Sequence, residues 1–135
     1  MEPSQTRILI VEDEEILLTA LSEELKQEGF QVTGAKDGVE GVEKVKSEKP
    51  DLVLLDLVMP RLDGIGALKQ MKDDPEIKDI PVVILTNLSD YDKISDALSL
   101  GAMDYLVKAN YRLEELVNKI KTVLERKKAD AASAV

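Results

Sequence analysis

Polar side chains that could do chemistry stand at the ends of four short apolar runs. The carboxylates of Glu12 and Asp13 follow one run and that of Asp56 ends another, whereas Thr86 and Lys108 stand at the ends of two more. The chain has no histidine and no cysteine, which excludes Ser-His-Asp triads, imidazole and thiolate metal ligands, cysteine nucleophiles and disulfides. Any chemistry therefore has to come from carboxylates, lysines, hydroxyls and a hard metal ion.

Gathered in one place, these side chains would form a site that accepts a phosphoryl group. Three carboxylates close together repel one another, so they need a cation or raised pKa values. Oxygen ligands suit Mg²⁺, and a carboxylate beside such an ion can act as a nucleophile and form an aspartyl-phosphate. A lysine and a hydroxyl would neutralise the phosphoryl oxygens. Taken singly, each residue also has a simpler explanation: Asp13 could cap a helix, Asp56 could be a turn residue and Lys108 could be solvated.

The elements that must position these residues are five apolar runs alternating with five amphipathic stretches. The last stretch is the clearest helix, because its apolar side chains recur at i, i+3, i+4, i+7 and i+11 from Leu113. The expected strands are 7–11, 30–35, 52–56, 82–86 and 104–107, and the expected helices are 14–28, 39–46, one through 67–71, 90–100 and 113–124.

Strict alternation of strands and helices predicts an α/β fold with a parallel, doubly wound sheet. Helices should cover both faces in three layers, because near-continuous apolar strands are buried on both sides. In such sheets the functional crevice lies at the carboxyl ends of the strands. The polar strand ends should therefore meet at one edge of the sheet.

Composition limits the setting and the partners. The 135 residues suit one domain over 7–128, preceded by a disordered N-terminal segment (1–6) and followed by a tail or truncated linker (129–135). With 27 acidic and 18 basic residues the net charge is −9, which argues against direct nucleic-acid binding. The sequence shows neither a signal peptide nor a membrane span, so we expect a cytoplasmic protein that does not bind membranes.

The chain resembles the receiver domains of two-component response regulators over essentially 7–128. Each motif is moderately specific, and all four in this order and spacing are very specific. The matching motifs are ILIVEDE (8–14), DLVLLDLVMP (51–60) with Asp63-Gly64, VVILT (82–86) and GAMDYLVK (101–108). The resemblance implies a flavodoxin-like (βα)5 fold of strand order 2-1-3-4-5, similar to stand-alone chemotaxis regulators.

The same resemblance implies a role for each polar residue at the strand ends. Asp56 would be the phosphorylated residue. Mg²⁺, with Mn²⁺ as an alternative, would be held by Asp13, Asp56 and the backbone carbonyl of Val58, with Glu12 acting through water. Lys108 and Thr86 would stabilise the phosphoryl group, and Thr86 and Tyr105 would form the switch.

Two departures from the family pattern bear on the site. The family usually has a proline after the lysine, often with a cis peptide bond, whereas this chain has Lys108-Ala109; we expect a trans bond, since a cis bond without proline costs about 2.5–4 kcal/mol. The residues two beyond Asp56 and Thr86 are the apolar Val58 and Leu88. Neither can orient an attacking water, so we hypothesise a long-lived phosphoryl state.

Charged residues toward the C-terminus fall where part of the family pairs across a symmetric dimer. Such surface ion pairs contribute only about 0–1 kcal/mol each, and a solvated face is the simpler interpretation for any one of them. The residues concerned are Lys93, Asp104, Glu115 and Lys119.

The predicted function is a phosphoacceptor switch rather than an enzyme. A sensor histidine kinase or a histidine phosphotransfer protein would phosphorylate Asp56, and the helix4-strand5-helix5 face would act on a downstream protein, with a phosphorylation-dependent homodimer as one form of output. Two alternatives stay open: a phosphorylation-independent binding module, and the receiver fragment of a larger regulator. An aspartate-based phosphohydrolase is disfavoured because Val58 stands where such enzymes carry a second acid.

Overall fold

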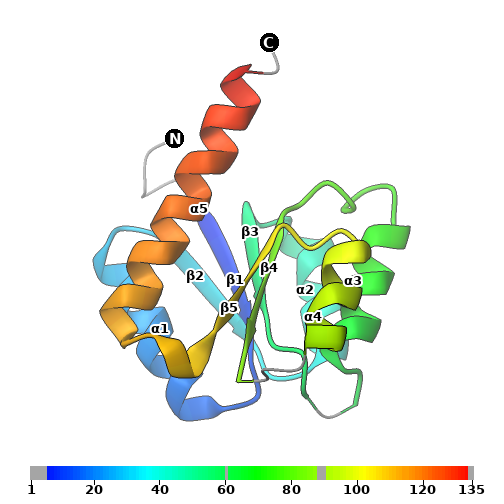
Figure 1. Ribbon diagram of the computed structural model, residues 1–135, viewed down its shortest axis with the longest axis horizontal. Helices are drawn as coiled ribbons and strands as arrows, with labels where there is room; N and C mark the ends of the chain where they lie inside the picture. Colours follow the sequence, from blue (N-terminus) through cyan, green and yellow to red (C-terminus); the bar gives the residue numbers. More distant parts are fainter. Residues whose placement is uncertain (1–5, 60, 88–90, 134–135) are drawn as a thin grey trace.

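A five-stranded parallel sheet forms the centre of the protein in the computed structural model, which describes residues 6–59, 61–87 and 91–133 (Figure 1). The strand order is β2-β1-β3-β4-β5, and every neighbouring pair is parallel. The predicted fold class and strand order are therefore confirmed. The strands are β1 (Arg7–Val11), β2 (Gln31–Ala35), β3 (Leu52–Leu55), β4 (Val82–Thr86) and β5 (Asp104–Val107).

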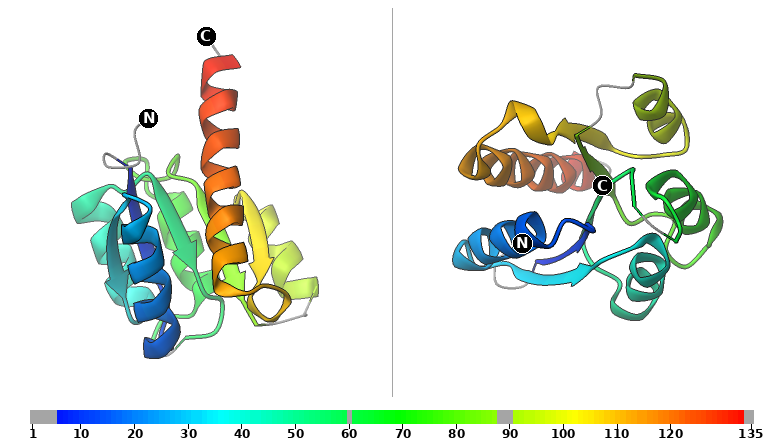
Figure 2. Two further views of the ribbon diagram at one scale, coloured as in Figure 1. Left: turned by 90° about the vertical axis from the view of Figure 1, so that its left-hand side faces the viewer. Right: turned by 90° about the horizontal axis from the view of Figure 1, so that it is seen from below.

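Helices cover both faces of this sheet and complete the three predicted layers. Helices α1 and α5 lie on one face, whereas α2, α3 and α4 lie on the other (Figure 2). Each face has its own apolar cluster, one centred on Leu55 and Leu68 and the other on Leu54 and Ile120. The helices are α1 (Glu15–Gln27), α2 (Gly38–Glu48), α3 (Gly64–Asp73), α4 (Tyr91–Ser99) and α5 (Leu113–Ser133).

The central strands are apolar throughout because both of their faces are covered. Every residue of β3 and β4 is buried, whereas the edge strand β5 is only partly buried. Alternate side chains of one strand enter opposite clusters, as Leu54 and Leu55 do. The sheet is therefore a rigid platform whose carboxyl edge carries the polar residues.

Two of the helices that border this edge begin with an aspartate cap. The Asp37 side chain accepts a hydrogen bond from the Glu40 amide at the start of α2, and Asp63 does the same for the Gly66 amide of α3. Helix α1 instead begins after Glu14, without a side-chain cap. Asp13 is therefore not a capping residue, which removes the simpler explanation for its position.

The two ends of the chain differ from the expected boundaries. Thr6, expected in the disordered segment, is buried, and its carbonyl accepts a hydrogen bond from the Gln31 amide; residues 1–5 of that segment lie outside the described residues. Helix α5 continues to Ser133 and extends past the sheet (Figure 2). The division into a domain and flanking segments stays a prediction. Within the described residues, no helix has the length and apolar character needed to cross a membrane.

Candidate functional site

The two central strands bring three carboxylates together at the carboxyl edge of the sheet. Strands β1 and β3 pair with Val11 opposite Leu55, so the residues that follow them lie side by side. The Asp56 amide donates to the Val11 carbonyl at 3.0 Å, which continues the ladder by one step. Carboxylate oxygens of Glu12, Asp13 and Asp56 all lie within 4.8 Å of one another. We call these three residues the acidic cluster; Glu12 and Asp56 are buried, whereas Asp13 is exposed.

A buried lysine from the edge strand pairs with this acidic cluster. Lys108 begins the 3₁₀ turn η2 (Lys108–Asn110) directly after β5, and its side chain is only 8% exposed. Its Nζ forms an ion pair with Oε1 of Glu12 and lies 3.3 Å from Oδ2 of Asp56. All peptide bonds of the described residues, including Lys108-Ala109, are trans, so the expected trans bond is confirmed. Lys108 reaches the acidic cluster without the proline that usually follows it in the family.

Burial dominates the ionisation of Glu12. Desolvation raises the pKa of its carboxyl to about 7, and the charge of Asp56 adds to the rise, whereas hydrogen bonds from Lys108 and the Glu14 amide oppose it. Burial also acts to lower the pKa of the Lys108 ammonium, but the hydrogen bond to Glu12 and the charge of Asp56 outweigh it and raise that pKa. The site therefore holds a charged lysine between two carboxylates, one of which binds a proton near neutral pH.

The stability of the metal-free protein should fall as the pH rises through the titration of Glu12. The folded protein binds the proton on Glu12 more tightly than the unfolded chain does. The stabilisation that this proton provides is therefore complete below about pH 4.5 and is lost as the pH rises through about 7. The difference corresponds to roughly 3 kcal/mol of unfolding free energy. Urea unfolding in a chelator, from pH 4.5 to pH 8, measures it for the wild type and for Glu12→Gln.

Substituting Glu12 should flatten this pH profile, because glutamine cannot titrate. An exposed carboxylate on α2, Glu43, provides the matched control as Glu43→Gln. This control should follow the wild-type profile. Parallel profiles for Glu12→Gln and the wild type would show that Glu12 titrates as it does in the unfolded chain.

The two predicted switch residues occupy neighbouring strands. Thr86 ends β4, is fully buried and pairs in register with Val107, next to Lys108. Tyr105 lies on β5 opposite Ile84, with 36% of its surface exposed. Leu88, the second residue of the lifetime hypothesis, lies outside the described residues. Thr86 is therefore placed beside the lysine, whereas Tyr105 lies at the edge of the sheet.

The segment after Asp56 turns one apolar side chain outward. Leu57 and Met59 are buried in the apolar cluster around Leu55, whereas Val58 between them is 53% exposed. The Val58 amide lies 3.3 Å from Oδ1 of Asp56, to which it donates a hydrogen bond. The Val58 amide is thus adjacent to the carboxylate of Asp56, and the role of the Val58 carbonyl as a metal ligand stays a prediction.

All four predicted dimer residues interact with other groups of the chain. Asp104 forms a 2.6 Å ion pair with Arg126, and the Lys119 ammonium lies 5.9 Å from the ring centroid of Tyr111. Glu115 accepts a hydrogen bond from the Arg112 amide. Lys93 is exposed on α4, and the dimer role of all four stays a prediction.

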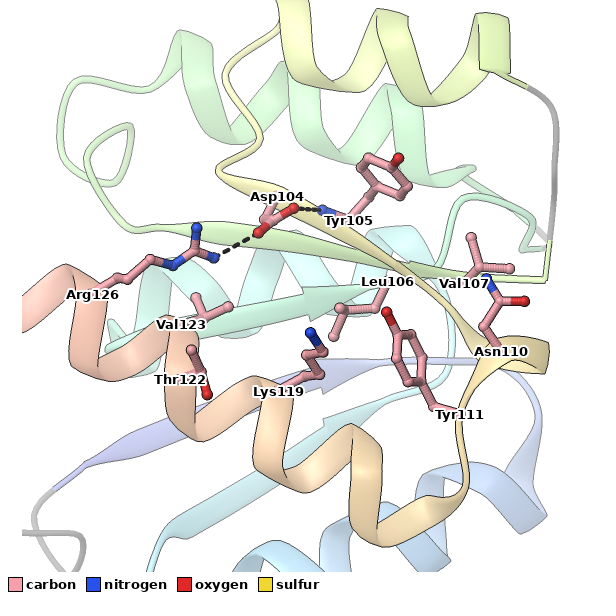
Figure 3. A pocket seen from close by; sticks show the side chains of 10 residues that line it. All are labelled: Asp104, Tyr105, Leu106, Val107, Asn110, Tyr111, Lys119, Thr122, Val123 and Arg126. Carbon is pink, nitrogen blue, oxygen red and sulfur yellow. Dashed lines mark hydrogen bonds and ion pairs between the residues drawn. The ribbon is translucent and has the colours of Figure 1, made fainter.

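A pocket of about 480 Å³ lies between β5 and α5, on the face that carries these charges. Asp104 and Arg126 meet across it, and Tyr111 and Lys119 lie on its α5 side, whereas Tyr105 extends from β5 on the other side of the strand (Figure 3). The pocket is therefore separate from the acidic cluster and belongs to the predicted output face.

The site can neutralise a hard dication and hold a phosphoryl group beside it. The site holds three carboxylates, two of which contact the one ammonium, so acidic groups outnumber basic ones, and oxygen atoms are the ligands that Mg²⁺ prefers. The donor set therefore fits such an ion. The sequence did not predict the ion pair between Lys108 and Glu12. The signal that could have indicated it is that a lysine and carboxylates which become buried together need partners of opposite charge.

A family model gives this arrangement a precedent. The model described as the response regulator receiver domain matches residues 8–121, which is most of the chain. The transcriptional regulatory protein PhoP for alkaline phosphatase synthesis, from Bacillus subtilis (strain 168), is 37% identical over 129 residues. The match covers 95% of this chain and 52% of PhoP. The chain spans about half the length of the curated relatives it matches.

Solved structures agree with the family model. The phosphorylated cyanobacterial phytochrome response regulator RcpA superimposes with a TM-score of 0.78 and 31% identity, covering 89% of this chain and 91% of RcpA. The Mn²⁺-bound form of response regulator Rcp1 gives a TM-score of 0.75 and 29% identity, covering 87% of this chain and 91% of Rcp1. Both similarities extend over nearly the whole of the solved chains.

Proposed function

The chain belongs to the response regulator receiver domain family, and from this premise we propose that it is a phosphoacceptor switch in which Asp56 receives the phosphoryl group. The observation that carries the proposal is the position of the Asp56 carboxylate, 3.3 Å from a buried ammonium and within a group of three carboxylates. Its role is regulatory: the chain would catalyse its own phosphorylation and a slow loss of the phosphoryl group.

Magnesium is the ion that we propose for the acidic cluster. Asp13, Asp56 and the backbone carbonyl of Val58 would hold it, with Glu12 contributing through water. When bound, the ion neutralises phosphoryl oxygens. Mn²⁺ is the alternative, and the Mn²⁺-bound form of Rcp1 supports an ion of this class in a related fold.

Phosphoryl transfer would use the carboxylate of Asp56 as the nucleophile. One of its oxygens forms a bond to phosphorus while the bond from phosphorus to the donor breaks, and the electron pair of that bond leaves with the donor. A phosphohistidine donor thereby returns as free imidazole, and acetyl phosphate returns as acetate. Lys108 neutralises charge on the transferred oxygens, and the hydroxyl of Thr86 donates a hydrogen bond to one of them.

Output would pass from Thr86 and Tyr105 to the face formed by α4, β5 and α5. A shift of Thr86 toward the phosphoryl group would change the position of Tyr105 and alter the surface that a downstream protein meets. In a phosphorylation-dependent homodimer, Lys93, Asp104, Glu115 and Lys119 would pair across the two copies. The pair between Asp104 and Arg126 would first have to open.

The proposed partners are proteins. A sensor histidine kinase or a histidine phosphotransfer protein would supply the phosphoryl group in the cytoplasm. The net charge of −9 opposes direct nucleic-acid binding by this domain. Two forms stay open, a stand-alone receiver and the receiver part of a larger regulator.

Incubation with acetyl phosphate tests the proposal directly. In Mg²⁺ the intact mass should rise by one phosphoryl group, and peptide mapping after borohydride reduction should place it on Asp56. A chelator should prevent the gain. No gain from acetyl phosphate or from phosphorylated histidine kinases would favour the phosphorylation-independent binding module.

The phosphoryl group should persist and should be lost faster when Val58 is polar. Val58 is exposed beside Asp56 but cannot orient an attacking water. An amide in its place could, so Val58→Asn should shorten the half-life roughly tenfold, whereas Val58→Ala should not. The measurement is the decay of the phosphorylated mass after removal of the donor. A half-life of only seconds in the wild type would refute the long-lived state.

A further inference from the structure

The turn between β2 and α2 packs against the segment that follows Asp56. This turn supplies none of the three carboxylates of the acidic cluster. Its Asp37 lies at the start of α2, and the segment it meets comprises the described residues Leu57–Met59 and Arg61–Asp63 between β3 and α3. The turn therefore contacts the segment that follows Asp56 without adding a carboxylate to the acidic cluster.

An ion pair joins the two parts. Nη1 of Arg61 lies 3.0 Å from Oδ2 of Asp37, whose side chain is only 13% exposed. The other oxygen of Asp37 accepts the Glu40 amide at 2.8 Å, so one carboxylate both caps α2 and binds Arg61. The helix therefore fixes the position of the Asp37 carboxylate, and the ion pair with this carboxylate in turn restrains the side chain of Arg61.

The backbone of Arg61 needs such a contact. Its φ of 66° is in the left-handed region, which costs a residue with a side chain more than it costs glycine. Without the pair to Asp37, the segment would gain by relaxing to an ordinary φ. That change would redirect the chain only three residues after Val58.

Two close backbone contacts link the position of the segment to that of Asp56. A Cβ at Gly38 would lie 2.0 Å from the Leu62 carbonyl oxygen, so α2 meets the segment without a side chain between them. A Cβ at Gly64 would lie 2.2 Å from the Asp56 carbonyl oxygen. The segment is thus confined between the start of α2 and the backbone of the phosphoacceptor residue.

We propose that Asp37 and Arg61 are positioning residues for the metal site, holding the Val58 backbone carbonyl where the ion needs it. This inference rests on the proposed function, because it concerns the ion placed there. Neither Asp37 nor Arg61 would contact the ion. Their ion pair would instead restrict the position of the segment that contains Val58. Residues that orient metal ligands without binding the metal commonly change affinity about 10- to 100-fold when they are removed.

Calorimetric titration of the metal-free protein with Mg²⁺ tests the inference without phosphoryl transfer. Arg61→Ala should raise the Kd for Mg²⁺ about tenfold. Asp37→Asn should raise it as much, because asparagine still caps α2 but loses the charge. The double variant should be no worse than either single one. Arg61→Lys should recover part of the affinity.

The chain offers a matched control in the pair of Lys46 and Asp74. It joins the same two neighbouring helices at their other ends, with a separation of 3.8 Å and a lysine side chain that is 55% exposed, against 62% for Arg61. Lys46→Ala should leave the Kd for Mg²⁺ at the wild-type value. The melting temperatures of Arg61→Ala and Lys46→Ala in a chelator should be alike.

Arg61→Gly separates the ion pair from the backbone conformation. Glycine adopts the left-handed φ freely but cannot bind Asp37, so it should also weaken Mg²⁺ binding. Wild-type affinity in both Arg61→Ala and Arg61→Gly would overturn the inference and leave the proposed function intact, as would equal losses in Lys46→Ala. Absence of Mg²⁺ binding in the wild type would instead count against the proposed metal site itself.

Discussion

Asp56→Asn is expected to keep its unmodified mass after incubation with acetyl phosphate and Mg²⁺, under conditions that add one phosphoryl group to the wild type. The amide has no anionic oxygen to attack phosphorus, and among the residues that the structure describes no other carboxylate is recorded in contact with both Lys108 and the Val58 amide. We expect complete loss rather than a slower reaction, because the nucleophile itself is gone. Intact-mass spectrometry over a time course measures the effect.

The loss should not come from unfolding. Asp56→Asn removes one of two buried carboxylates that face a single ammonium and leaves the pair between Lys108 and Glu12 in place, so the melting temperature should not fall. Asp51→Asn is the matched control: it changes the aspartate at the other end of the β3 segment, where Asp51 accepts the Arg7 amide. This control should gain the phosphoryl group normally. A full mass gain in Asp56→Asn would place the acceptor elsewhere.

Most of the fold was predictable because its elements differ sharply in apolar pattern. The runs at 52–55 and 82–85 are apolar on every residue, which is typical of strands buried on both faces, and the structure has β3 and β4 there. The periodicity from Leu113 predicted α5 but not its length, because the periodic apolar residues end at Leu124 and the helix continues to Ser133. The strand order came from the family resemblance and not from pattern alone.

The acidic cluster was predictable for a topological reason. Parallel strands end at one edge, so carboxylates after β1 and β3 meet whenever these strands are neighbours. Ionisation was not predictable in the same way, because it depends on burial that only the packed structure reveals. Glu12 and Asp13 are adjacent in sequence, yet one is almost completely buried with a pKa of about 7 and the other is exposed.

The ion pair between Asp37 and Arg61 shows what local patterns cannot reveal. The sequence did indicate a helix at 39–46, shortly after Asp37. No rule of spacing connects Asp37 with Arg61, which stands 24 positions later on a different connection and has a left-handed φ. Contacts between loops depend on how two βα connections pack, and they decide how precisely a site is held.

Removing the ammonium should impair the site more broadly than any other substitution that leaves Asp56 in place. Lys108→Met keeps the length and apolar stem of the side chain but removes its charge. Two buried carboxylates, Glu12 and Asp56, then face each other without the cation that pairs with both. Breaking a buried ion pair by removing one partner costs about 3–5 kcal/mol, so we expect a loss of about 3 kcal/mol in unfolding free energy at pH 8 in a chelator.

This loss of stability should depend on pH. The hydrogen bond from Lys108 lowers the pKa of Glu12, so its removal raises that pKa further above about 7. At pH 5 Glu12 is protonated in the folded variant, the repulsion with Asp56 disappears, and the variant should approach the wild type. Urea unfolding at both pH values measures the difference, with Lys121→Ala, which removes the exposed pair to Glu28, as the control that shows no such dependence.

The rate of phosphorylation by acetyl phosphate should fall on the order of a hundredfold in Lys108→Met, even at saturating Mg²⁺ and at a pH where the variant is folded. The reason is that transfer needs neutralisation of charge on the phosphoryl oxygens. Without Lys108, the oxygens that do not face the metal ion would have no cation beside them. Lys108→Arg should keep part of the rate, because it keeps the charge but not the compact ammonium. A variant that lost stability at pH 8 but phosphorylated at the wild-type rate would show that Lys108 holds the carboxylates together and takes no part in transfer. The variant could instead lose both stability and rate at pH 8 and regain only its stability at pH 5. That result would show that Lys108 has two separate roles, one in stability and one in phosphoryl transfer.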